Sequence, residues 1–262
     1  MDSSIQKLAR LIFQSQQIII FTGAGISTES GISDYRSKGG LWQRFQPVTI
    51  QDFITSEEKR VEYWLHKREL YESFTSCKPN DGHYFIKFLE DQKKLKGIIT
   101  QNIDGLHAQA GNDPNKILEL HGTNRETLCL TCQDVTSWGE SFARLQAGEA
   151  VLFCRKCQGL LKPNTVSFGQ NLNQEVLQKA YQWSRESDLF IVLGSTLVVE
   201  PAATLPRLAK QSGAKLVILT LSGTPLDAFA DMFIQQPIGE TLNKVKELLL
   251  SESSIPGGSI HE

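Results

Sequence analysis

The chain has 262 residues, about 1.7 times the roughly 150 residues of a typical domain. Hydrophobic residues make up 40% of the sequence, which is enough to bury a core and excludes a disordered chain. The 27 basic and 29 acidic side chains leave a net charge of −2, so bulk charge predicts neither direct nucleic-acid binding nor membrane attraction. Since no secretory signal and no apolar run of membrane-spanning length is visible, we expect a cytoplasmic, reducing location.

The predicted elements alternate between helices and strands. Residues 4–15 carry apolar side chains at helical spacing, which predicts an N-terminal helix. Four short runs are apolar at nearly every position, which is typical of strands buried on both faces of a parallel sheet. These runs are residues 18–21, 97–100, 189–193 and 216–219. Helical patterns over 173–186 and 202–212 lie between the later runs, so the sequence predicts a doubly wound α/β fold with helices on both faces of the sheet.

Two stretches interrupt this alternation. Residues 40–78 hold most of the aromatic and mixed charged side chains, which indicates a helical insertion. Residues 128–160 hold two cysteine pairs and little that could form a core, and so small a segment needs a metal to hold its shape. We therefore expect a main domain of residues 1–39, 79–127 and 161–262, the helical insertion, and a small metal-binding module.

The spacing of the cysteines predicts which metal the small module binds. Cys129 and Cys132 form one C-x2-C pair, and Cys154 and Cys157 form a second pair after 21 residues. Each pair can turn two thiolates toward one point, and two pairs complete a tetrahedral zinc site with no open position. The zinc is therefore expected to be structural. A redox role for one pair is the alternative, which the presence of two matched pairs disfavours; Cys77 is left as a spare thiol.

A glycine turn follows the first predicted strand, where nucleotide-binding folds keep their phosphate loop. Gly23 and Gly25 would let a pyrophosphate approach the backbone, but Thr28 stands where the strict dinucleotide fingerprint has a third glycine. A tight turn without a ligand is the alternative. Two other predicted strands also end in small or polar residues, at 100–107 and 194–196. Because the carboxyl ends of parallel strands meet at one edge of a sheet, we expect a shared ligand crevice there.

With these motifs in place, the sequence resembles the sirtuins, a family of NAD-dependent protein lysine deacylases. The matching motifs are GAGIS…SGISDYR at 23–36, TQNIDGLH at 100–107, ELHG at 119–122, KPNTVSFGQN at 162–171 and GSTLVVEPA at 194–202, in family order with the cysteine pairs among them. The resemblance implies a Rossmann-like NAD-binding domain with a small zinc ribbon. It also implies NAD as a consumed cosubstrate and an acylated-lysine protein or peptide as the substrate.

The resemblance further implies roles for single residues. His121 would be the general base that deprotonates a ribose hydroxyl, a task suited to the unperturbed pKa of histidine, and Asn102 would act beside it. The residues expected to bind NAD are Gly23, Ala24, Gly25, Thr28, Asp34, Tyr35, Arg36, Gln101, Asn102, Ile103, Asp104, Gly194, Ser195, Thr196 and Thr220. Those expected to bind the peptide, by strand addition, are Val166, Phe168, Gly169, Gln170 and Val198. His83 and His107 are expected to be structural.

Several positions depart from the family pattern. Tyr35 replaces a usual phenylalanine, and Ser33 replaces the proline before the aspartate, which loosens the loop. Gln170 replaces a common glutamate and removes a charge that could meet a basic peptide. Thr220 replaces an asparagine on the adenosine ribose, which puts the affinity for NAD in question.

The function predicted from these motifs is an NAD-dependent protein deacylase, with deacetylation as the favoured reaction. The positions matching the Tyr-x-x-Arg pair of sirtuins that prefer acidic acyl groups are Leu65 and Arg68, so the missing tyrosine disfavours desuccinylation. Mono-ADP-ribosyl transfer or lipoamide hydrolysis is an alternative on the same fold. A non-catalytic NAD-sensing module is another, and the intact His121, Asn102 and Asp104 argue against it.

Overall fold

Six parallel strands form the central sheet of the computed structural model, which describes residues 3–34 and 46–253. In spatial order the strands are β3 (Ile117–Glu119), β2 (Leu95–Thr100), β1 (Ile18–Thr22), β7 (Leu189–Leu193), β8 (Lys215–Leu219) and β9 (Met232–Ile234). The chain runs outward from β1 to β3 and later returns to the other side of β1 with β7, so the winding reverses between these two neighbours. The parallel α/β sheet predicted from the sequence is confirmed.

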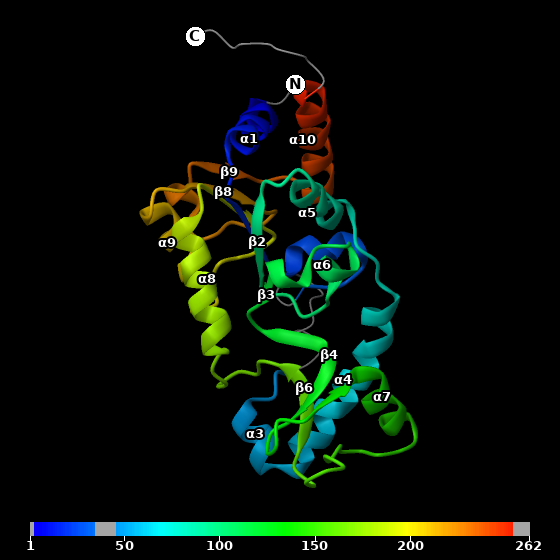
Figure 1. Ribbon diagram of the computed structural model, residues 1–262. Helices are drawn as coiled ribbons and strands as arrows, with labels where there is room; N and C mark the ends of the chain where they lie inside the picture. Colours follow the sequence, from blue (N-terminus) through cyan, green and yellow to red (C-terminus); the bar gives the residue numbers. More distant parts are fainter. Residues whose placement is uncertain (1–2, 35–45, 254–262) are drawn as a thin grey trace.

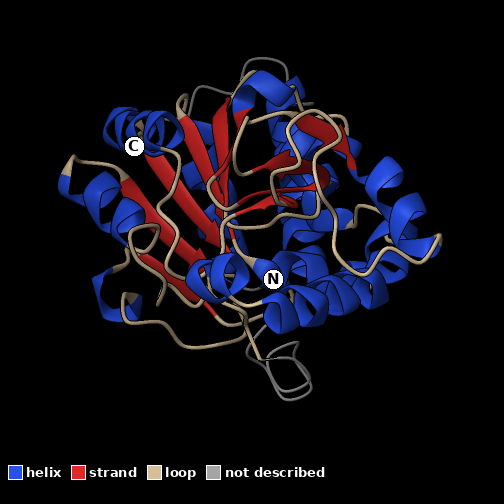
Figure 2. Ribbon diagram, turned by 90° about the horizontal axis from the view of Figure 1, so that it is seen from below, coloured by secondary structure: helices blue, strands red, loops and turns tan. Residues whose placement is uncertain are grey.

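Helices cover both faces of this sheet (Figures 1 and 2). One face packs against α1 (Ser3–Gln14), α5 (Asp81–Asp91) and α10 (Ile238–Ser253), and the other packs against α8 (Gln174–Glu186) and α9 (Thr204–Gln211). Successive side chains of a strand point to opposite faces. In β1, Ile18 and Ile20 therefore join the first core while Ile19 and Phe21 join the second. This burial on both sides explains why the strands are apolar at almost every position.

Side-chain caps set where two of these helices begin. The Asn80 side chain accepts the backbone N–H of Gly82 at 3.0 Å before α5, and Asn173 accepts that of Glu175 at 2.9 Å before α8. Such a cap satisfies one of the four N–H groups that a helix start leaves without a partner. The predicted helices at the N-terminus, at 173–186 and at 202–212 are present as α1, α8 and α9.

A second, smaller sheet lies beyond the carboxyl end of the large one (Figure 1). Its antiparallel strands, in the order β5, β4, β6, are β5 (Val135–Ser137), β4 (Gly122–Cys129) and β6 (Leu161–Thr165). The helices α3 (Ile50–Thr55), α4 (Glu57–Ser76) and α7 (Trp138–Gln146) surround it. β4 and β6 extend beyond residues 128–160 on both sides, and the domain boundaries expected from the sequence stay a prediction.

A third apolar core joins the helical insertion to the cysteine-bearing segment. Phe53 and Trp64 come from the insertion, while Trp138 and Leu161 come from around the small sheet. The rings of Trp64 and Trp138 stack with their centroids 5.9 Å apart. The two stretches that interrupt the α/β alternation therefore pack as one structural unit, called here the small unit.

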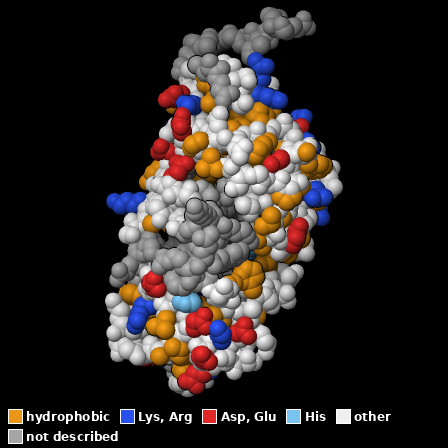
Figure 3. Space-filling view, turned by 180° about the vertical axis from the view of Figure 1, so that it is seen from behind, with side chains coloured by type: hydrophobic (Ala, Val, Ile, Leu, Met, Phe, Trp, Pro, Cys, Tyr) orange, Lys and Arg blue, Asp and Glu red, His pale blue; other side chains and the backbone are white. Residues whose placement is uncertain are grey.

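Two further observations concern the molecule as a whole. Within the part of the chain that the structure describes, no helix has the length and apolar character needed to cross a membrane. On the face seen in Figure 3, acidic and basic side chains are interspersed. This agrees with the near balance of 27 basic and 29 acidic residues.

Candidate active site

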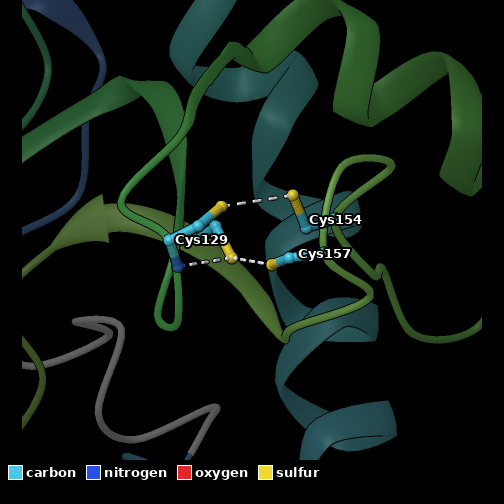
Figure 4. Close-up of side chains that lie close together, drawn as sticks. Cys129, Cys154 and Cys157 are labelled. Atoms are coloured by element: carbon cyan, nitrogen blue, oxygen red, sulfur yellow. Dashed lines mark hydrogen bonds between the residues drawn. The ribbon is translucent and has the colours of Figure 1, made fainter.

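The four paired cysteines converge on one point of the small unit. Their sulfur atoms all lie within 4.8 Å of one another, with Cys129 Sγ 3.5 Å from Cys157 Sγ and Cys132 Sγ 3.7 Å from Cys154 Sγ. Figure 4 shows Cys129, Cys154 and Cys157 pointing toward each other. A tetrahedral site with zinc–sulfur bonds of about 2.3 Å separates its sulfurs by about 3.8 Å.

Backbone N–H groups also point at these sulfurs, as they do at thiolates. Thr131 N lies 3.4 Å from Cys129 Sγ, and Gly159 N lies 3.4 Å from Cys157 Sγ. The donor set and its spacing fit one structural zinc ion with four thiolate ligands. Four thiolates would leave no open position on the ion for a substrate, so a bound zinc would hold the small unit together and would not act as a Lewis acid.

A cavity of about 870 Å³ lies between the large sheet and the small unit. It opens at the carboxyl ends of β1 and β7, where the winding of the sheet reverses and where α/β proteins bind their ligands. Its size is in the upper range of ligand sites. The predicted site residues that line it are Gly23, Ala24, Gly25, Thr28, Asp34, Gln101, Asn102, Ile103, His121, Val166, Phe168, Gly169, Gln170, Gly194, Ser195, Thr196, Val198 and Thr220.

Glycine is required where the winding of the sheet reverses, because two backbone segments come into close contact there. Gly25 N donates to Gly194 O at 2.9 Å, and a Cβ on Gly23 or Gly25 would come within 2.8 Å of that carbonyl oxygen. Gly194 has a φ of +66°, a conformation that favours glycine. The loops after β1 and β7 therefore touch each other and form the floor of the cavity, so the turn and the ligand site are one feature.

Asn102 is buried and held at both ends. Its backbone N–H donates to Thr100 Oγ1 at 3.0 Å, and its Nδ2 donates to Gly23 O at 3.2 Å and to Ser27 Oγ at 3.1 Å. The side chain of the neighbouring Gln101 accepts the Ser195 hydroxyl at 2.7 Å. Polar groups from three strand ends are thereby fixed around the cavity before a ligand arrives.

His121 presents one nitrogen to the cavity as a base. Its Nδ1 lies 2.9 Å from Gln101 O, and since a carbonyl only accepts, Nδ1 carries the proton and Nε2 keeps its lone pair. Burial lowers the pKa of His121 below its usual value, although the Gln101 carbonyl opposes this in part. The ring is therefore neutral at pH 7 and able to take a proton at Nε2.

Asp104 is placed differently from the predicted NAD-binding residues that line the large cavity. Asp104 accepts from Ser27 Oγ at 2.8 Å and from the Leu106 N–H at 2.9 Å, and burial raises the pKa of its carboxyl group. It lines an adjoining pocket of about 310 Å³ and not the large cavity. Tyr35 and Arg36 lie outside the described residues.

The segments predicted to bind the peptide flank the cavity mouth. Phe168 and Val198 line the cavity and are about half exposed. The first segment is tied to the base, because Val166 N donates to His121 O at 2.8 Å. Gln170 folds back, its Oε1 accepting the Ser167 N–H at 3.2 Å.

The sequence did not reveal the contribution of the helical insertion to the cavity. Tyr63 and Lys67, one helical turn apart on α4, line it together with Val48. Leu65 and Arg68, the positions matched to the acyl-reading pair, are exposed and lie outside the lining. The i, i+4 spacing of Tyr63 and Lys67 was a signal, but the helix has no clear apolar side by which to orient it.

Lys67 is an unusual lining residue because no carboxylate balances its charge in the described part of the site. Its Nζ donates to the amide oxygen of Asn124 at 3.3 Å and lies 5.6 Å from the centre of the Tyr63 ring. Burial lowers the pKa of Lys67 to about 8. The ammonium is thus still mostly protonated at neutral pH.

Together, these features define a doubly wound α/β protein with a ligand cavity at its switch point and a four-thiolate metal site. The family model described as Sir2 family matches residues 23–201. The chain is 43% identical over 248 residues to an NAD-dependent protein deacetylase of Thermodesulfovibrio yellowstonii, covering 95% of this chain and 96% of that relative. It is 38% identical to the NAD-dependent protein deacylase 2 of Archaeoglobus fulgidus, with 94% and 96% covered. The chain belongs to the Sir2 family.

Solved structures agree with this membership. One described as Sir2–p53 peptide–NAD+ superposes with a TM-score of 0.85 at 37% identity and covers 95% of this chain and 98% of the other. Another, described as Sir2 bound to acetylated peptide, has a TM-score of 0.84 at 34% identity, with coverage of 95% and 98%. The fold and the family predicted from the sequence motifs are confirmed.

Proposed function

We propose that this chain is an NAD-dependent protein lysine deacylase that acts on acetyl-lysine. The proposal is carried by the state and position of His121. Its ring lines a cavity large enough for a dinucleotide and is neutral, with the proton on Nδ1 and the lone pair on Nε2. Family membership and the names of the relatives support the same reaction.

The carbonyl oxygen of the acylated lysine attacks C1′ of the NAD ribose as the bond from C1′ to nicotinamide breaks, and nicotinamide leaves. The backbone at Gly23, Gly25 and Gly194 lets the pyrophosphate approach closely. Gln101 binds the ribose hydroxyls, and Ser195 and Thr196 contact phosphate or adenosine. Asn102 orients the reacting groups without changing its own charge. His121 Nε2 accepts the proton of a ribose hydroxyl as its oxygen attacks the acyl carbon. Water then adds to the acyl carbon and the lysine amine leaves, so that one water is consumed and the products are nicotinamide, free lysine and O-acyl-ADP-ribose.

The acylated peptide enters as a strand between two cavity-flanking segments. Phe168, Gly169 and Gln170 lie on one side, and Val198 lies on the other. Pairing through backbone groups gives affinity with little demand on peptide sequence. Val166 lies beside the acyl chain, near His121. Asp104, Tyr35 and Arg36 remain proposed NAD ligands on the strength of the family motif.

The three-part division of the chain, with boundaries near residues 40, 79, 128 and 160, is part of this proposal. Packing of the helical insertion against the cysteine-bearing segment supports treating these two as a unit apart from the large sheet. The four converging cysteines are arranged as a metal site and not as two disulfides, which favours a cytoplasmic location.

One assay separates deacylation from its alternatives. Nicotinamide release is measured with and without an acetyl-lysine peptide, and the peptide mass is followed. Release that requires the peptide and accompanies loss of the acetyl mass supports the proposal. ADP-ribose attached to protein would favour ADP-ribosyl transfer, and no release at all would favour a non-catalytic module. His121→Ala should abolish peptide deacetylation while the bound zinc stays unchanged.

A further inference from the structure

The turn that follows β1 forms part of the cavity wall and is held in place from behind. This turn, η1 (Ala24–Ser30), contributes Gly25, Thr28 and Glu29 to the lining of the large cavity. It is a 3₁₀ turn, in which the hydrogen-bond geometry is poorer than in an α-helix. Contacts from other elements therefore help to fix its shape, and with it the wall that the proposed cofactor meets.

Asn80 contacts this turn from the start of α5. Its Nδ2 donates to Ile26 O at 2.7 Å and to Ser30 Oγ at 2.9 Å. Its Oδ1 accepts the Gly82 N–H at 3.0 Å, which caps the helix, and His83 Nδ1 lies 3.0 Å from the same oxygen. Since a carbonyl oxygen only accepts and a backbone N–H only donates, the contacts with Ile26 and Gly82 fix the orientation of the amide. One side chain therefore caps α5 and holds η1.

Helix α10 makes a second contact with the same turn. Glu29 Oε1 accepts the backbone N–H of Gly239, near the start of α10, at 3.0 Å. Helices α5 and α10 also pack against each other (Figure 1). A Cβ on Gly82, in the first turn of α5, would lie 3.2 Å from side-chain atoms of both Ile26 and Ile238, so the three elements meet closely. The starts of α5 and α10 thus support η1 on the side away from the cavity.

The two ends of the Asn80 amide have roles that can be separated. The oxygen caps a helix, and the oxygen of a serine or an aspartate at the same position can do this equally well. The nitrogen donates two hydrogen bonds to η1, and neither serine nor aspartate has an amide nitrogen with which to replace it. Substitution by these two residues therefore removes the contact with the turn and keeps the cap of the helix.

We propose that Asn80 is a positioning residue that holds η1 in the shape that binds NAD. Asn80 does not line the cavity, so it acts through Gly25 and Thr28, which do. When the turn is released, only the fraction of molecules with the competent shape binds NAD, and the apparent Kd rises in inverse proportion to that fraction. The peptide-flanking residues Phe168 and Val198 lie on other segments and are unaffected. The inference rests on the proposed function only in placing NAD in this cavity.

Two substitutions at Asn80 test the lost donor. Asn80→Ser is uncharged but smaller, whereas Asn80→Asp keeps the size of the side chain but adds a charge. In both variants we expect the Kd for NAD, measured by titration calorimetry, to rise about tenfold, because two hydrogen bonds to the turn are lost. KM for the acetyl-lysine peptide at saturating NAD should stay within about twofold of the wild-type value. Asn173→Ser is the matched control, because Asn173 caps α8 on the opposite face of the sheet.

An unchanged Kd for NAD in both Asn80 variants would overturn the positioning role. A rise in only one of them would overturn it too, because the size or the charge of the new side chain, and not the lost donor, would then be the cause. An equal rise in Asn173→Ser would show that any change at a helix cap weakens NAD binding, and this also contradicts a specific role for Asn80.

Amide hydrogen exchange of the ligand-free protein tests the same role without turnover. The N–H groups of Gly31 and Ile32 bond back to Thr28 O and Ser27 O in the turn. In Asn80→Ser these amides should exchange about tenfold faster, while those of α5 keep their wild-type rates because the cap remains. Faster exchange in α5 as well would mean that Asn80 acts mainly as a cap, and would overturn the proposal. If the wild type binds NAD but deacylates no acyl peptide, the proposed function fails, and both tests of Asn80 still apply.

Discussion

At the scale of single residues, the chemistry of the site depends on which nitrogen of His121 is hydrogen-bonded to a backbone carbonyl. Gln101 O holds the Nδ1 proton of His121 and so directs the lone pair of the base into the cavity. The sequence motif identified the residue, but the choice of nitrogen depends on a contact between two segments that only the fold brings together.

The pH dependence of turnover should report on His121. Its neutral form is the base, and burial lowers the pKa of the ring below the usual value for histidine. As the pH falls through this lowered pKa, the ring takes up a proton and activity is lost. We therefore expect kcat/KM for the acetyl peptide to be constant from about pH 7 to 8 and to halve only below about pH 6.5. A midpoint above pH 7 would contradict the neutral buried base, and peptide binding measured over the same range is the control.

Lys67 should affect which acyl groups are accepted. Its ammonium lines the cavity, and among the described residues its hydrogen-bond partner is the amide oxygen of Asn124. An acyl chain ending in a carboxylate would therefore gain a charge-assisted hydrogen bond. We expect Lys67→Met to lower the ratio of succinyl-lysine to acetyl-lysine turnover by about tenfold.

The matched control is Arg68→Met, which removes a charge from the exposed neighbour on the same helix. It should leave the ratio unchanged. An equal effect of both variants would mean that overall charge, and not the cavity, reads the acyl group.

At the scale of elements, the zinc site supports one wall of the cavity indirectly. Cys129 and Cys154 belong to the same apolar core as Tyr63 and Trp64, and Tyr63 lines the cavity. The small unit has a limited core of its own, so the metal supplies much of its folding free energy. Damage to the metal site should therefore weaken binding of the peptide more than binding of NAD.

Removal of zinc by a chelator, or the change Cys157→Ser, tests whether peptide binding is weakened more than NAD binding. We expect the stacked Trp64–Trp138 pair to separate, with a change in tryptophan fluorescence, and acetyl-peptide binding to weaken at least about tenfold. NAD binding should change much less, because Gly23, Gly25 and Gly194 belong to the large sheet. Cys77→Ser is the control, since Cys77 is not among the converging sulfurs. Equal loss of both ligands would show that the two units do not unfold separately.

At the scale of the whole molecule, the features that could be predicted from the sequence are those that a local pattern of residues determines. Buried strands such as β1 and β7 are apolar at nearly every position, and the paired cysteines have the spacing of a zinc site, so both features could be predicted. The three-residue edge strands β3 and β9 were missed because so short a run has no periodicity. Tyr63 and Lys67 were missed because no local pattern says which side of α4 meets a cavity built mainly from distant segments. Contacts across the chain decide those positions.

The cavity has walls from both parts of the molecule, so its ligands should couple the large sheet to the small unit. His121→Ala keeps the walls and stops turnover, which allows NAD and the acetyl peptide to be bound together. At ligand concentrations of about 100 times Kd, binding stabilises the folded protein by about 2.7 kcal/mol. Where a segment must release the ligand before it can open, its amide hydrogens should exchange about 100-fold more slowly. NAD alone should protect the loops after β1 and β7. Adding the peptide should extend protection to β6 and α4, whose Thr165 and Tyr63 line the same cavity. Protection by the peptide that stays within the large sheet would mean that the small unit does not help to hold the substrate.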